Sequence, residues 1–117
     1  MGAHSGFTVA VEAVEAGERG RVVVAVSGDL DLWGATKLHL PLTDALKSPV
    51  VVLDLTDCGF CDSSGLRTLL HAVARAREEG TSLRIAGVGT SVLRVLEMTG
   101  LLSELSLYQD VPAALKG

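Results

Sequence analysis

The segment VVVLDLTDCGFCDSSGLRTLL, residues 50–70, holds the pattern that decides the fold of this chain. Its first part, residues 50–55, opens with the apolar run Val50-Val51-Val52-Leu53, typical of a strand that lies inside a sheet with both faces covered. From Leu66 onward, apolar residues recur every three or four positions, as in a helix that buries one face, and Gly80 supplies a typical helix end. A buried strand that leads directly into an amphipathic helix predicts an α/β fold.

Asp62, Ser63 and Ser64 stand at the start of this helix, where backbone N–H groups have no intrahelical partner. Aspartate and serine are favoured N-caps, and one cap is enough, so Asp62 or Ser63 could serve alone. At least one hydroxyl is then surplus. Because the helix dipole presents partial positive charge here, a phosphate on Ser63 or Ser64 would find favourable electrostatics. The segment is therefore a candidate phosphorylation site as well as a cap.

The rest of the chain predicts four further strands and three further helices. The strands are expected at residues 7–14, 21–27, 82–86 and 105–108, with a turn at residues 16–20 between the first two. The helices are expected at residues 33–47, 90–98 and 111–116. Pro41 should kink the first of these helices or break it, because proline lacks a backbone N–H and clashes with the preceding turn. The order of elements implies one α/β domain with a mixed, mostly parallel sheet of about five strands and about four helices.

Composition narrows the class of protein. The chain has 117 residues, a length typical of one domain, and 48% of them are hydrophobic, enough to form a core without disulfides or metals. No apolar run approaches the ~20 residues of a membrane span and no signal peptide is recognised, so we expect a cytoplasmic protein without membrane contact. The net charge is −4 and the basic residues are scattered, which argues against nucleic-acid binding.

Cys58 and Cys61 form a C-x-x-C motif between the strand and the helix, which is where thioredoxin-like enzymes carry their redox pair. A reactive thiol benefits from the positive end of a helix. Here, however, Asp62 follows, and a neighbouring anion raises the pKa of a thiol. We therefore expect both cysteines to be buried apolar residues, with a thiol-disulfide protein as the alternative.

Other catalytic motifs do not match. Ser63 and His71 do not form the catalytic pair of a hydrolase. The nucleophile elbow of such enzymes needs glycine two residues before the serine, where Cys61 stands. A zinc site needs four ligands, and His4, His39 and His71 have no matching spacing. We expect no enzymatic activity, no cofactor and no metal.

Two further segments complete a pattern known from a protein family. Gly28-Asp29-Leu30-Asp31 follows the second expected strand and predicts a turn in which Asp31 caps the next helix or serves a functional role. Thr99-Gly100-Leu101 follows the penultimate helix. With Asp62-Ser63-Ser64-Gly65-Leu66 between them, in the same order and spacing, these segments resemble the STAS domain, in particular that of the bacterial anti-sigma factor antagonists.

The resemblance covers about residues 7–115 and implies that residues 1–117 form a single STAS domain. It implies a non-enzymatic switch that binds an anti-sigma factor, often a serine kinase of the histidine-kinase-like ATPase type, and so frees a sigma factor for transcription. In such proteins the first serine of the motif is phosphorylated, here Ser63 with Ser64 as the alternative, and a serine phosphatase reverses the modification. The implied partner-binding residues are Asp31, Asp62, Ser63, Ser64 and Gly65.

The chain departs from the family pattern at three places. Gly34-Ala35 stand where a Thr-Ala pair is common, and Pro41 interrupts a helix that is usually continuous. Cys58 and Cys61 occupy positions that are normally apolar, in agreement with a role in packing. Within the family, the alternative function is an accessory subunit of a phospholipid-transport ATPase, which would need no phosphorylation cycle.

Overall fold

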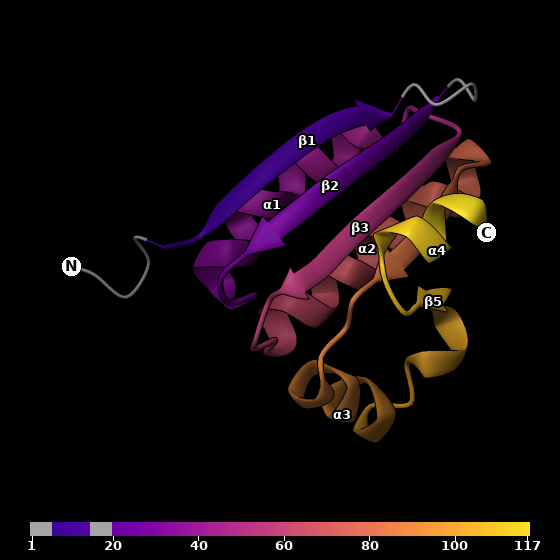
Figure 1. Cartoon of the computed structure of the whole chain (residues 1–117). Helices are drawn as coiled ribbons and strands as arrows, with labels where there is room; N and C mark the ends of the chain where they lie inside the picture. The colour runs from indigo at the N-terminus through magenta and orange to yellow at the C-terminus, as the bar shows by residue number, and fades with distance from the viewer. Residues whose placement is uncertain (1–5, 15–19) are drawn as a thin grey trace.

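The computed structural model describes residues 6–14 and 20–117, and within them it contains five strands and four α-helices (Figure 1). The strands are β1 (Thr8–Val14), β2 (Arg21–Ser27), β3 (Val50–Asp57), β4 (Ser82–Ala86) and β5 (Leu107–Tyr108). The helices are α1 (Leu32–Ala45), α2 (Ser63–Glu79), α3 (Thr90–Met98) and α4 (Val111–Lys116), with a 3-10 turn, η1 (Leu102–Glu104), after α3. The turn expected at residues 16–20 lies outside the described residues except for Gly20. None of the described helices is both long enough and apolar enough to cross a membrane.

The strands form one mixed sheet in the order β1-β2-β3-β4-β5. β1 pairs with β2 in antiparallel fashion, and the other neighbours are parallel. The predicted α/β fold with a mostly parallel sheet is therefore confirmed. Because β2, β3 and β4 run in the same direction, the helices that follow them all begin at the same edge of the sheet. This edge carries the candidate site.

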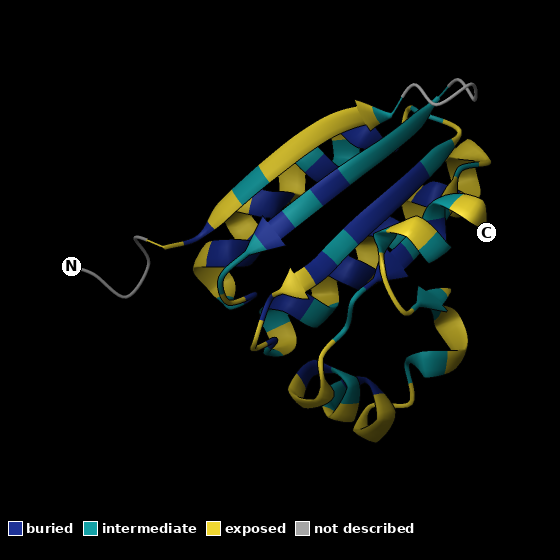
Figure 2. Cartoon of the chain, viewed as in Figure 1, coloured by how far each residue is buried: buried dark blue, intermediate teal, exposed yellow. Residues whose placement is uncertain are grey.

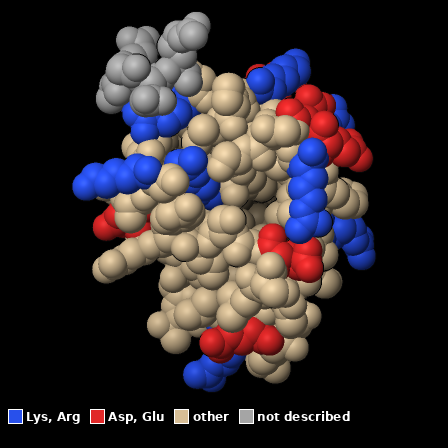
Figure 3. Space-filling model, turned by 90° about the vertical axis from the view of Figure 1, so that its right-hand side faces the viewer, with Lys and Arg blue, Asp and Glu red and all other residues tan. Residues whose placement is uncertain are grey.

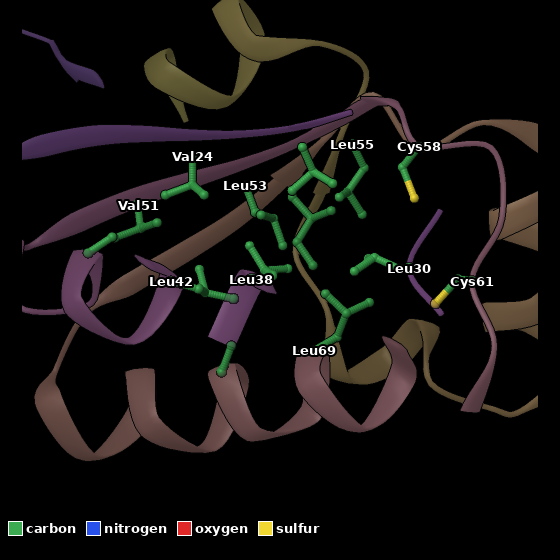
Figure 4. Packing of buried hydrophobic residues seen from close by; sticks show 14 of the residues in the cluster. Val24, Leu30, Leu38, Leu42, Val51, Leu53, Leu55, Cys58, Cys61 and Leu69 are labelled. Carbon is green, nitrogen blue, oxygen red and sulfur yellow. The ribbon is translucent and has the colours of Figure 1, made fainter. Parts of the chain in front are cut away.

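The main hydrophobic core lies between one face of the sheet and the helices α1 and α2 (Figures 1 and 2). Val24, Val51 and Leu53 of the sheet belong to the same cluster as Leu38 of α1 and Leu69 of α2 (Figure 4). Burying a side chain of this kind stabilises the fold by about 1.5–3 kcal/mol. Among the described residues no polar or charged residue is buried, so this core consists almost wholly of aliphatic side chains.

The opposite face of the sheet is covered in part by α4. Ala114 of this helix packs against Val52 and Ala86. Two arginines from the sheet bind the end of the helix: Arg21 Nη1 donates to the carbonyl of Leu115, and Arg84 Nη1 donates to that of Ala114, both at 2.7 Å. Cations at the carboxyl end of a helix stabilise its unpaired carbonyls, so these contacts hold α4 on the sheet.

Charged side chains of both signs are interspersed on the face shown in Figure 3. Arg75 lies 3.3 Å from Glu79, and Arg77 lies 3.1 Å from Glu104. Exposed ion pairs of this kind contribute about 0–1 kcal/mol each to stability. In each pair the positive and negative charges neutralise one another at the surface.

Of the two outcomes expected at Pro41, a kink or a break, the break does not occur. The helix α1 runs without interruption from Leu32 to Ala45 with the proline inside it. Leu38 and Leu42, on either side of Pro41, are buried and fix both halves of the helix in the core. Their packing therefore outweighs the local penalty of proline, which is ~3 kcal/mol in a helix interior.

Candidate functional site

Two loops lie side by side at the edge of the sheet where α1 and α2 begin. The loop after β2, residues 28–31, and the loop after β3, residues 58–62, are joined by a parallel bridge between Leu30 and Cys61. Leu30 N–H donates to Phe60 O at 2.9 Å, and Gly28 N–H donates to Asp57 O at 3.1 Å. The carboxyl ends of parallel strands are the usual place for binding sites in open α/β sheets. All five residues implied by the resemblance lie at this edge.

Asp62 caps α2. Its Oδ1 accepts hydrogen bonds from the backbone N–H groups of Ser64 at 2.8 Å and Gly65 at 3.2 Å. Its carbonyl accepts from the N–H of Leu66 at 2.9 Å. Of the two candidates for the cap, Asp62 is therefore the one used, and neither serine hydroxyl is needed for that purpose.

The two serines differ in accessibility. Ser63 is exposed, and Ser64 is half-buried. Within the described residues, the Ser63 hydroxyl makes no hydrogen bond, so it is free to react. Successive residues of an α-helix point about 100° apart, which separates the two hydroxyls although they are adjacent in sequence. A modifying enzyme would therefore reach Ser63 more easily.

Gly65 supports the site through its small size. It is buried, and a Cβ atom at this position would come closer than 3.0 Å to the carbonyl oxygen of Leu30 and to Cys61 Sγ. Real Cβ atoms do not approach other atoms so closely, so a larger residue would push the two loops apart. The third residue after the cap must therefore be glycine here.

Asp31 caps α1 in the same way that Asp62 caps α2. Its Oδ1 accepts from Gly34 N–H at 2.9 Å, as predicted. Gly34 is buried, and a Cβ there would come closer than 3.0 Å to the carbonyl of Asp29 and to the ring of Phe7. Glycine in place of the common threonine is therefore required by the way this chain packs its N-terminal segment.

Three exposed apolar residues at this edge were not among the predicted site residues. Leu32 is 69% exposed, Phe60 49% and Trp33 45%. Leu32 and Trp33 follow the cap Asp31, and Phe60 is bonded to the loop before it. Large apolar residues that cluster in solvent mark interaction surfaces. The available signal was the pair of large apolar residues, Leu32 and Trp33, directly after the predicted cap Asp31.

Cys58 and Cys61 are buried in the core beneath these loops, 3% and 2% exposed, as predicted. Figure 4 shows both sulfur atoms beside Leu30 at one end of the hydrophobic cluster. Burial raises the pKa of Cys58, and it raises the pKa of Cys61 to about 12, with Cys58 and Asp62 adding to the effect. Both thiols are free and protonated at neutral pH. The nucleophile of a thiol-disulfide enzyme needs the reverse, a lowered pKa and access to solvent.

Comparison with known proteins identifies relatives of the whole fold. A family model described as "Mlab, STAS domain" matches residues 14–107. The anti-sigma F factor antagonist of Paenibacillus polymyxa is 29% identical over 100 residues, which cover 83% of this chain and 86% of that protein. A crystal structure of an anti-sigma factor antagonist from Mycobacterium paratuberculosis superposes with a TM-score of 0.85 at 28% identity, covering 98% of this chain and 95% of the other.

A further structure with the same fold is more distant in sequence. The structure of the Bacillus cell fate determinant SpoIIAA in the phosphorylated form has a TM-score of 0.66 at 17% identity, and the match covers 94% of this chain and 97% of that one. At this level of identity the likeness shows a common fold.

Proposed function

Because the chain belongs to the STAS domain family, we propose that it is an anti-sigma factor antagonist, which binds an anti-sigma factor and so releases a sigma factor for transcription. The partner is an anti-sigma factor of the histidine-kinase-like ATPase type that is also a serine kinase. Two relatives that match most of the chain are anti-sigma factor antagonists, which supports an anti-sigma factor as the partner; the kinase type of this partner is part of the proposal. The observation that carries the proposal is the free, exposed hydroxyl of Ser63 at the start of α2.

The contact surface comprises this hydroxyl and the exposed apolar side chains at the same edge of the sheet. Leu32 and Phe60 provide the apolar area that a partner can remove from water, worth about 25 cal/mol per Å². Asp31 and Asp62 lie at the same edge, and each uses one carboxylate oxygen to cap its helix. The unmodified surface therefore presents an uncharged hydroxyl and exposed apolar groups at one edge of the sheet, and burying Ser63 adds no charge to an interface.

Phosphorylation prevents this surface from binding the partner. The kinase transfers the γ-phosphoryl group of ATP to Ser63 Oγ, the hydroxyl proton is released, and ADP leaves. The phosphate carries about −1.5 to −2 charges at pH 7 and lies next to Asp62. Burying it against a partner without a matching cation costs several kcal/mol, so the complex dissociates. A serine phosphatase hydrolyses the phosphate ester and restores the binding state.

In this cycle the chain is a substrate and a ligand, and the partner enzymes perform the chemistry. The STAS family to which it belongs is regulatory and binds proteins. No group of three or more His, Cys, Asp or Glu side chains that could hold a metal ion is found in the described part of the chain.

The test is phosphorylation by a histidine-kinase-like ATPase from the same genome, with ATP, followed by mass spectrometry of the digested chain. We expect one phosphate on the peptide that contains Ser63, no phosphate in Ser63→Ala, and unchanged labelling in the matched control Ser64→Ala. Label confined to Ser64 would contradict the assignment. Tight binding to a transport ATPase without any labelling would favour the alternative, an accessory subunit of a phospholipid-transport complex.

A further inference from the structure

A phosphate on Ser63 would find few free donors at the end of α2. The N–H groups of Ser64 and Gly65 are already bound by the carboxylate of Asp62, and that of Leu66 by the Asp62 carbonyl. Asp62 also adds a negative charge beside the modified residue. The helix dipole remains, but exposed it supplies only weak attraction. The phosphate therefore needs a side-chain cation if it is to be held in one place.

Arg67 is in the right place to be that cation. It lies four residues after Ser63, one turn further along α2, and residues with this spacing have Cβ atoms about 5–6 Å apart on the same face of a helix. Ser63 and Arg67 are both exposed. A guanidinium group can donate two parallel hydrogen bonds to a phosphate, and such bonds are about twice as strong as those between neutral groups.

Arg67 is also unengaged, unlike most of the other arginines. Arg75 and Arg77 are bound to Glu79 and Glu104, and the two arginines of the sheet are bound to the end of α4. Within residues 6–14 and 20–117, only Arg67 and Arg94 are arginines without a hydrogen bond or an ion pair to another residue. Arg94 belongs to α3, a different helix.

We propose that Arg67 binds the phosphate of phosphorylated Ser63. The inference rests on the proposed function, because it concerns the modified state of the same serine. Arg67 is a positioning residue: it holds the phosphate on the outer face of α2, where an approaching partner meets it, and it offsets the repulsion from Asp62. Since a nearby cation favours the doubly charged form, it also lowers the second pKa of the phosphate.

The test uses the full chain with phosphoserine placed at position 63 by genetic encoding, so that it does not depend on any kinase. A ³¹P NMR titration gives the second pKa of the phosphate. We expect Arg67→Gln to raise this pKa by about 0.3–0.7 unit, which is about twice the effect of an ordinary pair at this spacing, and Arg67→Lys to raise it less. The Nε–H resonance of Arg67 should also shift when the serine carries phosphate.

The matched control is Arg75→Gln, on the same helix but two turns further on and bound to Glu79. It should leave the second pKa of the phosphate unchanged. The proposal is overturned if Arg67→Gln leaves this pKa unchanged, or if Arg94→Gln raises it as much. Failure of the proposed function is a different result: no kinase would then label Ser63. The contact between Arg67 and the phosphate is still measured in that case, because the phosphoserine is encoded genetically.

Discussion

Asp62 N–H donates a hydrogen bond of 3.2 Å to the carbonyl oxygen of Leu30. The residue that caps α2 is thus held by the loop that leads into α1, and both helices begin at fixed positions relative to each other. Gly65 allows this contact, because it leaves room for the Leu30 carbonyl. The exposed serine is therefore presented on a rigid base made of two loops.

Phosphorylation of Ser63 should abolish partner binding without unfolding the domain. The serine is exposed, so the fold tolerates the group, whereas burial in an interface would cost several kcal/mol and each ~1.4 kcal/mol is a factor of ten in affinity. We expect a loss of at least about 100-fold for phosphoserine, a smaller loss for Ser63→Asp, and constitutive binding by Ser63→Ala. Calorimetry with the partner measures these affinities. If the melting transition is lost on phosphorylation, the loss of affinity is caused by unfolding and not by repulsion at the interface.

Loss of the Asp62 cap should destabilise α2. Asp62→Ala removes the acceptor for two backbone N–H groups, and such substitutions typically cost about 1 kcal/mol of the free energy of unfolding. Asp62→Asn keeps a side-chain oxygen and should cost less. Denaturant titration of the three proteins measures the difference. Equal stabilities would show that the cap makes no net contribution.

Gly65→Ala should destabilise the fold by about 1–3 kcal/mol, because the new methyl group overlaps the Leu30 carbonyl and Cys61 Sγ. Gly59→Ala is the matched control. A Cβ at Gly59 meets no atom within 4 Å, although the residue belongs to the adjoining loop. Thermal melts of both variants test the argument, and a similar change in the two would contradict it.

The raised pKa of Cys61 predicts a loss of stability at alkaline pH. Its pKa is about 12 in the folded chain against an ordinary value of 9.0, so between about pH 9 and 12 the unfolded chain releases a proton that the folded chain keeps. The free energy of unfolding should therefore fall as the pH rises through this window, and this contribution vanishes below it. Denaturation at pH 8 and pH 10.5 should show a smaller fall in Cys61→Ala than in the natural chain. Equal falls would exclude the effect.

The exposed apolar residues at the site should contribute to binding and not to stability. Leu32→Ala and Phe60→Ala remove apolar area that only a partner can bury, and we expect each to weaken binding about tenfold or more. Leu40→Ala is the matched control, since Leu40 is equally exposed on α1 but lies eight residues, about 12 Å, from Leu32. Binding assays and melts of the three variants separate the two roles. Equal losses in all three would disprove a localised site.

The order of strands and helices could be predicted from the sequence because it depends on local periodicity. The apolar run at residues 50–55 and the spacing after Leu66 each identify an element without knowledge of its neighbours. The cap at Asp31 could also be predicted, because its donor and acceptor are only three residues apart in the chain.

The contacts between distant segments could not be predicted in this way. Pro41 stays helical because of residues that pack on α1 from the sheet, and Gly34 is required by Phe7, which precedes it by 27 residues in the chain. The choice of Asp62 over Ser63 as the cap was open for a different reason. Either residue can cap the helix if the helix begins one position earlier or later, and the sequence pattern does not fix that position.

Three backbone hydrogen bonds join residues 28–31 to residues 57–62, and backbone bonds do not depend on which side chains are present. They do depend on the number of residues in each loop. An insertion or deletion of one residue in either loop would shift the pairing and misplace the start of α1 or α2. Evolution can therefore exchange a side chain such as Phe60 to suit a new partner, while the lengths of both loops stay fixed.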